Sequence, residues 1–269
     1  MNAPVEVSAG IFDVDLPLAV PAEITAAARH FERDGYAVFP RVLANYLPLL
    51  SEACDDFVTR EDARMDAAGV ESIGISHRGK RYFANECQRA QPALRKVIFG
   101  TTFAAICRAL LGEDAYFFFD QFVVKGPEGG LPFSWHQDSG YVRGKNGPIA
   151  HAPYLTCWCP LDDATAENGT VRLIPGSHHK GLLDHEWRAE INDLAVNVSD
   201  EAITVPVPAG SVVAFSSLLL HATGANRSAA RRRVYLAQFS PAPMLDPDTG
   251  HLRRNAIRLL QGGRHVTLP

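Results

Sequence analysis

The segment AYFFFDQFVVK, residues 115–125, is where the sequence pattern changes from helical to β. From here to about residue 240, short apolar or alternating runs are separated by clusters of Gly, Pro, Asn and Asp. The later runs cover residues 133–137, 154–161, 170–174, 202–207, 211–215 and 233–239. Short strands at regular spacing, with turn residues between them, predict an all-β sandwich or barrel rather than a sheet of alternating strands and helices.

The residues before this segment are predicted to be mainly helical. Residues 22–34 are helix formers and are followed by Gly35, a common residue at the C-terminal end of a helix. The other elements predicted here are a short strand at 36–40 and helices at 45–60 and 102–111. Residues 62–90 are mixed and polar, and the pattern assigns them no structure.

No linker separates the helical part from the β part, so we expect a single domain over residues 1–269. Its predicted parts are a helical N-terminal region at about 20–112, a β core at about 115–240 and a C-terminal extension at 241–269. The sequence does not indicate a role for this extension, nor which N-terminal residues line a substrate pocket.

The composition excludes several classes of partner. With 21% charged residues and a formal net charge of −4, the chain gives no electrostatic reason to expect nucleic acid or an anionic membrane. No run approaches the roughly 18 apolar residues of a membrane span, and the N-terminus lacks the features of a signal peptide. Five irregularly spaced cysteines suggest no disulfide framework. We therefore expect a cytoplasmic monomer or homodimer with reduced cysteines in its core and a small-molecule substrate.

A candidate metal site begins at Trp135-His-Gln-Asp138. In a strand, residues two apart point the same way, so His136 and Asp138 are expected to project from one face. A third ligand, His221, follows an apolar stretch 83 residues after Asp138. Two histidines and one carboxylate leave three positions of an octahedral metal open, which is the arrangement of non-haem iron(II) oxygenases. Structural zinc instead prefers four closed ligands.

Five motifs in this order and spacing, across roughly residues 115–240, resemble the phytanoyl-CoA dioxygenase family of iron(II)/2-oxoglutarate oxygenases. The first is the Trp135–Asp138 motif. The other four are LTCWCPLDD (155–163), ENGT (167–170), LIPGSH (173–178) and HATGANRS (221–228), and the last of these is followed by three arginines, Arg231 to Arg233. The resemblance implies a mainly β fold, with a double-stranded β-helix (jelly roll, cupin-like) core packed by the N-terminal helices and the metal at one open end.

The resemblance also implies roles for individual residues. His136, Asp138 and His221 correspond to the three iron ligands. Four further positions correspond to contacts of the cosubstrate 2-oxoglutarate: Arg232, Thr223, Trp158 and Gln121. Arg232 lies eleven residues after His221, at the position of the arginine that binds the distal carboxylate, and strand alternation places it on the opposite face from Arg231 and Arg233.

The chemistry implied by the family uses Fe(2+), 2-oxoglutarate and O₂. Chelation by 2-oxoglutarate occupies two of the three open metal positions and leaves one for O₂. The planar fork of an arginine binds a carboxylate bidentately, and a hydroxyl such as that of Thr223 supports it. The expected reaction releases succinate and CO₂ and hydroxylates a small molecule.

Two other functions are weighed against this one. A cupin-like metal dioxygenase without 2-oxoglutarate has no need of Arg232, and a non-enzymatic binding module has no need of an intact ligand set. A halogenase is disfavoured because halide must take the place of the carboxylate, and Asp138 is present. The sequence does not identify the substrate. The residues after the metal motif, 139–142, do not match ectoine hydroxylases, and no basic cluster suited to coenzyme A is visible.

Several residues near the motifs allow more than one interpretation. Trp135 is predicted to point away from His136 into the core. Phe133 and Tyr141 are expected either to face substrate or simply to pack. His185 has no evident partner in the sequence and is expected to be exposed.

Overall fold

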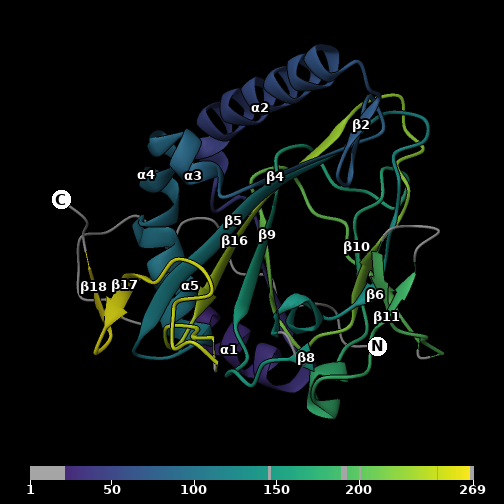
Figure 1. Ribbon diagram of the computed structural model, residues 1–269. Coiled ribbons are helices and arrows are strands. Elements are labelled where there is room, and N and C mark those ends of the chain that lie inside the picture. Colours follow the sequence, from purple (N-terminus) through teal and green to yellow (C-terminus); the bar gives the residue numbers. More distant parts are fainter. Residues whose placement is uncertain (1–21, 145–146, 189–192, 200, 247, 267–269) are drawn as a thin grey trace.

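The computed structural model describes residues 22–144, 147–188, 193–199, 201–246 and 248–266 (Figure 1). The helices are α1 (Ala22–Asp34), α2 (Leu47–Ala68), α3 (Cys87–Ala90), α4 (Arg95–Ile98) and α5 (Thr101–Leu110). The strands of the first part are β1 (Tyr36–Phe39), β2 (Ser72–Ile73), β3 (Ser76–His77), β4 (Arg81–Asn85), β5 (Ala115–Lys125), β6 (Phe133–His136), β7 (Arg143–Gly144), β8 (Gly147–Pro148) and β9 (Leu155–Pro160). The later strands are β10 (Val171–Leu173), β11 (Glu186–Arg188), β12 (Asp193–Ala195), β13 (Ile203–Thr204), β14 (Val212–Ser216), β15 (His221–Thr223), β16 (Arg232–Ser240), β17 (Ile257–Gln261) and β18 (Arg264–His265).

Two antiparallel sheets form the β core. The larger sheet has the order β1-β14-β9-β16-β5-β4-β3-β2, with β17 added to β5 and β18 to β17, and the smaller has the order β13-β10-β15-β6. Buried side chains from both sheets pack together between them, among them Leu173 of the smaller sheet and Phe215 of the larger. This architecture confirms the predicted mainly β fold with a jelly-roll core.

The helices cover the outer face of the larger sheet (Figure 1). Strand β16 shows how the sequence produces both layers, because its side chains alternate. Tyr235 and Phe239 are buried in the cluster shared with the helices, whereas Val234 and Leu236 are buried in the cluster between the sheets. A strand that is buried on both faces requires a nearly continuous apolar run, which is what residues 233–239 provide.

The helices predicted at 22–34 and 102–111 agree with α1 and α5, and the helix predicted at 45–60 is longer than expected. The helix expected at 45–60 is α2, which runs to Ala68. It ends at Gly69, whose φ of 65° is the left-handed conformation that favours glycine and whose N–H donates to the Asp66 carbonyl at 3.1 Å. The unassigned region 62–90 contains β2, β3, β4 and α3 as well as the end of α2.

The C-terminal extension completes the larger sheet. Strand β17 pairs with the first residues of β5, and the Asn255 side chain donates to the Phe118 carbonyl at 3.2 Å. All five cysteines are buried free thiols, as predicted. None of the helices in the described ranges is long and apolar enough to cross a membrane. The expected cytoplasmic location and monomeric or homodimeric state stay predictions.

Asp120 links the helical layer to the larger sheet through two hydrogen bonds. Its Oδ2 accepts hydrogen bonds from the Tyr235 hydroxyl and from the Gln88 N–H of α3, both at 2.9 Å. Its other oxygen is buried and has no hydrogen-bond partner in the described part of the chain. Burial raises the pKa of the Asp120 carboxyl to about 6, although these two donors oppose the shift.

This raised pKa predicts a pH-dependent stability. An acid with a higher pKa in the folded state binds more protons there, so its ionisation lowers the free energy of unfolding as pH rises from about 4 to about 6. With an unfolded pKa of about 3.9, the loss is about 2–3 kcal/mol. Asp120→Asn keeps an acceptor but does not ionise, so its stability relative to wild type should rise by this amount across the window. Urea denaturation at several pH values measures it, with exposed Asp248→Asn as control, and a variant that follows the wild-type pH profile contradicts it.

Candidate active site

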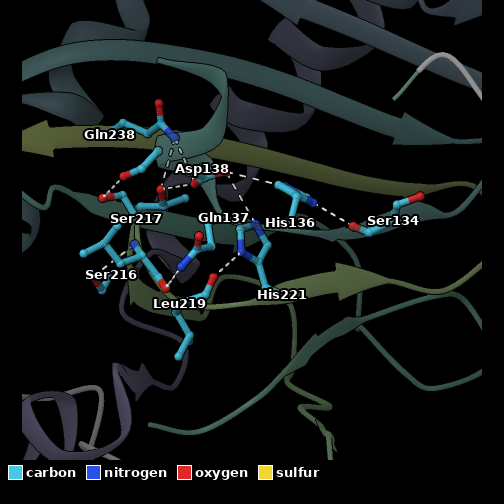
Figure 2. Close-up of polar contacts among 12 residues, drawn as sticks. Ser134, His136, Gln137, Asp138, Ser216, Ser217, Leu219, His221 and Gln238 are labelled. Atoms are coloured by element: carbon cyan, nitrogen blue, oxygen red, sulfur yellow. Dashed lines mark hydrogen bonds and ion pairs between the residues drawn. The ribbon is translucent and has the colours of Figure 1, made fainter. Parts of the chain in front are cut away.

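His136 and His221 come from neighbouring strands of the smaller sheet. His136 ends β6, His221 begins β15, and the two residues are direct partners in the antiparallel pairing of these strands. Paired residues present their side chains on the same face, and the two ring centroids lie 4.2 Å apart (Figure 2). Both side chains are buried. Strand pairing therefore brings together two histidines that are far apart in the sequence.

Backbone carbonyls orient the two imidazole rings. His136 Nδ1 lies 2.7 Å from the Ser134 carbonyl oxygen, and His221 Nδ1 lies 2.9 Å from that of Leu219 (Figure 2). A carbonyl only accepts a hydrogen bond, so each Nδ1 carries the proton. Each Nε2 therefore carries the lone pair that can bind a metal, and the hydrogen bonds at Nδ1 fix its direction.

Asp138 supplies the third donor. Strand β6 ends before it, and Asp138 begins a 3₁₀ turn (Asp138–Tyr141), but Gln137 is extended, so the predicted alternation holds as far as Asp138. Asp138 Oδ1 lies 3.6 Å from His136 Nε2 and 3.4 Å from His221 Nε2. Burial opposes ionisation of this carboxyl, but the two histidines hold its pKa well below the usual value. The three donor atoms lie within 4.8 Å of one another and can hold a metal ion.

The second oxygen of Asp138 is held by two residues that the sequence did not single out. Thr156 donates its hydroxyl to Asp138 Oδ2, and the Gln238 amide donates to the same oxygen at 3.1 Å (Figure 2). Thr156 on β9 and Gln238 on β16 are partners in the larger sheet. Because these contacts satisfy Oδ2, the carboxylate presents Oδ1 to the metal position.

Gln137 ties the two ligand-bearing strands together. Its buried side-chain amide donates to the carbonyls of Gly181 at 2.7 Å and Leu218 at 2.6 Å, and its Oε1 accepts the Leu183 N–H at 2.7 Å. The backbone N–H of Gln137 donates to His185 Nε2 at 2.9 Å. The expectation that His185 is exposed is wrong, because it is partly buried behind the metal motif by this contact.

A cavity of about 380 Å³ adjoins the three donors and also reaches Arg232. The Arg232 side chain is buried, and its Nε and Nη2 atoms have no hydrogen-bond partner among the described residues. Its guanidinium carbon lies 5.6 Å from the centre of the Trp158 ring. Burial lowers the pKa of Arg232 to about 10, so the group is charged at neutral pH. A buried cation without an anionic partner is costly, so this position is suited to a bound carboxylate.

Two further cations lie in one row with Arg232 across the larger sheet, and sequence reasoning missed both as site residues. Arg81 on β4 pairs with Lys125 on β5, which pairs with Arg232 on β16, so the three buried side chains lie in one row. Lys125 Nζ donates to Thr223 Oγ1 at 2.7 Å and to the Gly224 carbonyl. Since Thr223 Oγ1 accepts that bond, its own hydrogen is free to be donated to a carboxylate.

The remaining predicted residues occupy distinct positions. Thr223, Trp158 and Gln121 all line the cavity, but Gln121 lies opposite Leu236, four residues along the sheet from the row of cations. Phe133 and Tyr141 line the cavity as well. Trp135, predicted to be in the core, is only partly buried, with the Arg172 guanidinium 5.3 Å from its ring centre.

A jelly-roll core with two histidines and a carboxylate converging at a cavity defines the class of non-haem iron oxygenases. The chain belongs to the phytanoyl-CoA dioxygenase family, whose model matches residues 31–234. Among curated proteins it is similar to L-proline trans-4-hydroxylase from Streptomyces griseoviridis. The two are 27% identical over 249 residues, which cover 83% of this chain and 88% of the relative. The chain is an iron- and 2-oxoglutarate-dependent oxygenase.

Solved structures share the fold. The non-heme alpha ketoglutarate dependent carbocyclase SnoK from nogalamycin biosynthesis aligns with a TM-score of 0.66 at 21% identity, covering 86% of this chain and 92% of that one. EvdO2 from Micromonospora carbonacea var. aurantiaca, complexed with 2-oxoglutarate, aligns with a TM-score of 0.66 at 24% identity, covering 83% and 93%. At these identities the alignments establish the common fold.

Proposed function

We propose that His136, Asp138 and His221 hold the iron of this oxygenase, and that the enzyme hydroxylates a small molecule at the cavity beside them. The observation that carries this assignment is the convergence of three donor atoms at the cavity that contains the buried Arg232 guanidinium, two of whose nitrogen atoms have no partner among the described residues. A metal site alone fits many proteins. A metal site facing a buried cation fits a cosubstrate that chelates through one end and carries a carboxylate at the other.

The protein's own residues position both groups. His136 and His221 offer fixed Nε2 lone pairs, and Thr156 and Gln238 turn Oδ1 of Asp138 toward the metal position. Arg232 is assigned to the distal carboxylate of 2-oxoglutarate, with the Thr223 hydroxyl as a second donor. Trp158 holds the guanidinium by its ring face, and Gln121 lines the cavity nearer its middle.

Iron and 2-oxoglutarate, when bound, supply the oxidising chemistry in which O₂ and 2-oxoglutarate yield succinate, CO₂ and one oxygen atom inserted into a substrate C–H bond. The chain supplies an apolar enclosure for it. Phe215 packs on the His221 ring with centroids 4.5 Å apart, and Tyr141 packs on the His136 ring at 5.3 Å. These rings shield the donors from water and leave the cavity as the route to the metal position.

Oxygen-dependent conversion of 2-oxoglutarate tests this function. Purified protein with Fe(II), ascorbate and 2-oxoglutarate should form succinate in air and not under nitrogen, because O₂ is a reactant. A true substrate should raise the rate and take up one atom of ¹⁸O from labelled O₂. Succinate formation that does not depend on iron, or no succinate with any small molecule tested, argues against the assignment.

A further inference from the structure

The cavity lining is strongly unbalanced in charge. Among the described residues that line it, Asp138 is the one carboxylate, whereas four arginines line it: Arg81, Arg232, Arg253 and Arg254. Asp138 is assigned to iron and Arg232 to 2-oxoglutarate, and Arg253 pairs with Asp246 at 3.6 Å. Arg254 makes no ion pair with any described residue and belongs to the C-terminal extension, which the proposed function does not use.

Arg254 is exposed to solvent, but its guanidinium stacks on an aromatic ring of the cavity wall. Its guanidinium carbon lies 4.4 Å from the centre of the Phe119 ring, which also lines the cavity. The neighbouring backbone is anchored on both sides. The Arg253 N–H donates to the Met244 carbonyl at 2.9 Å, and the Asn255 N–H donates to the Phe118 carbonyl at 3.2 Å. A stacked and anchored guanidinium loses less conformational entropy on binding an anion than a free one does.

Tyr154 supplies a second polar group at this end of the cavity. The residue is 3% exposed, lines the cavity, and its hydroxyl makes no hydrogen bond with any described residue. Burial raises the pKa of Tyr154 well above its usual value, so the hydroxyl keeps its proton and acts as a donor. A hydroxyl that lines the cavity and donates to no described residue can donate to a bound ligand.

The surface around these two groups is apolar. Phe118, Phe119, Tyr154 and Met244 form one buried cluster, against which Val142 packs. The Phe118 and Tyr154 rings meet edge to face with centroids 4.9 Å apart. No carboxylate in this part of the described lining is available to neutralise an ammonium group. Besides the ion-paired Arg253, the end of the cavity therefore offers the Arg254 guanidinium, one hydroxyl donor and a hydrophobic wall.

We propose that the substrate is a small carboxylate with an apolar body and no free amine. Its carboxylate binds Arg254 and Tyr154, and its body packs on the apolar wall formed by Phe118, Phe119 and Met244. This inference rests on the proposed function, because it places a C–H bond of the substrate beside the iron ligands that line the same cavity. It separates this chain from its amino-acid hydroxylase relative, whose zwitterionic substrate carries an ammonium group.

Calorimetric titration of the protein loaded with Ni(II) and 2-oxoglutarate tests the substrate class. The probes are 3-phenylpropanoate, its amide, 3-phenylpropylamine and L-proline. We expect 3-phenylpropanoate to bind about tenfold or more tightly than the amide, because a hydrogen bond to a charged group is stronger than one to a neutral group. The amine and L-proline should bind most weakly. Equal binding of carboxylate and amide, preference for either amine-bearing probe, or no binding of the carboxylate overturns the proposal.

Variants locate the carboxylate. Arg254→Gln should weaken 3-phenylpropanoate binding about tenfold and leave the amide unchanged, and Tyr154→Phe should weaken it about threefold to tenfold. Arg258→Gln is the matched control, because Arg258 also stacks on an aromatic ring of β5, with its guanidinium carbon 4.8 Å from the Tyr116 ring centre, but does not line the cavity. An Arg254→Gln variant that keeps wild-type selectivity refutes the assignment. The affinity of wild-type protein for 2-oxoglutarate is measured first, because it distinguishes the two proposals. Wild type that does not bind 2-oxoglutarate would contradict the proposed function itself.

Discussion

Arg232→Ala is expected to weaken the binding of 2-oxoglutarate by roughly 30-fold to a few thousand-fold. Removing one member of a buried, hydrogen-bonded charge pair costs about 2–5 kcal/mol, and each factor of ten corresponds to about 1.4 kcal/mol. The side chain is buried at the cavity and its Nε and Nη2 atoms have no hydrogen-bond partner among the described residues, so truncation removes packing, including that on Trp158, but no hydrogen bond of these two atoms. The measurement is the KM or Kd for 2-oxoglutarate.

The two neighbouring arginines are the controls. Arg231 is exposed, and Arg233 lies on the same outer face, where it pairs with Asp162 at 2.8 Å and Asp55 at 3.1 Å. Arg231→Ala and Arg233→Ala should change 2-oxoglutarate affinity by less than about tenfold, because partly exposed ion pairs contribute little and neither reaches the cavity. Sensitivity at Arg231 or Arg233 instead of Arg232 would show that the cosubstrate assignment is wrong.

His136→Ala is expected to abolish turnover while the protein stays folded. The imidazole is one of the three donors that the described residues bring to the metal position, so its loss removes a third of that coordination. We expect the fold not to depend on the metal, because the chain buries large apolar clusters on both faces of the larger sheet. Turnover and the thermal unfolding midpoint should both be measured, with the exposed His251→Ala as a control for loss of a histidine.

The outcomes of this variant separate a catalytic metal from a structural one. Unfolded His136→Ala, together with wild type that loses its structure when chelator removes the metal, would show a structural site. Retained turnover in His136→Ala would exclude the residue as a ligand.

Strand periodicity explains why much of the fold was predictable. In β16 a run of nine residues alternates between helix-facing and cavity-facing side chains, and this alternation selects Arg232 over its two neighbours. The same alternation in β9 places Thr156 on the face of Trp158, and in β16 it places Gln238 on the face of Arg232. The sequence pattern therefore indicates that Thr156 and Gln238 face the cavity side of the sheet. Only the pairing of β9 with β16 shows that the two residues lie side by side.

The rest depends on contacts between distant segments that periodicity does not report. Strands β2 and β3 have two residues each, too short for any alternating signal. The five residues of β4, RYFAN, do not alternate between apolar and polar, so Arg81 stayed unassigned. Lys125 ends a predicted strand, but its position in a row of buried cations follows from the pairing of β4, β5 and β16. Arg254 and Tyr154 share one cavity because β17 pairs with β5, which brings the C-terminal extension against that strand.

An anaerobic spectrophotometric titration tests most directly whether His136, Asp138 and His221 hold iron together with 2-oxoglutarate. Wild-type protein should bind one Fe(II) per chain, and addition of 2-oxoglutarate should produce a weak visible charge-transfer band that saturates at one equivalent. The band requires the metal and the chelating cosubstrate at the same site, so His136→Ala should lack it, whereas Arg232→Ala should need much more 2-oxoglutarate to produce it. No band in wild type at saturating 2-oxoglutarate, or an undiminished band in His136→Ala, would contradict this assignment.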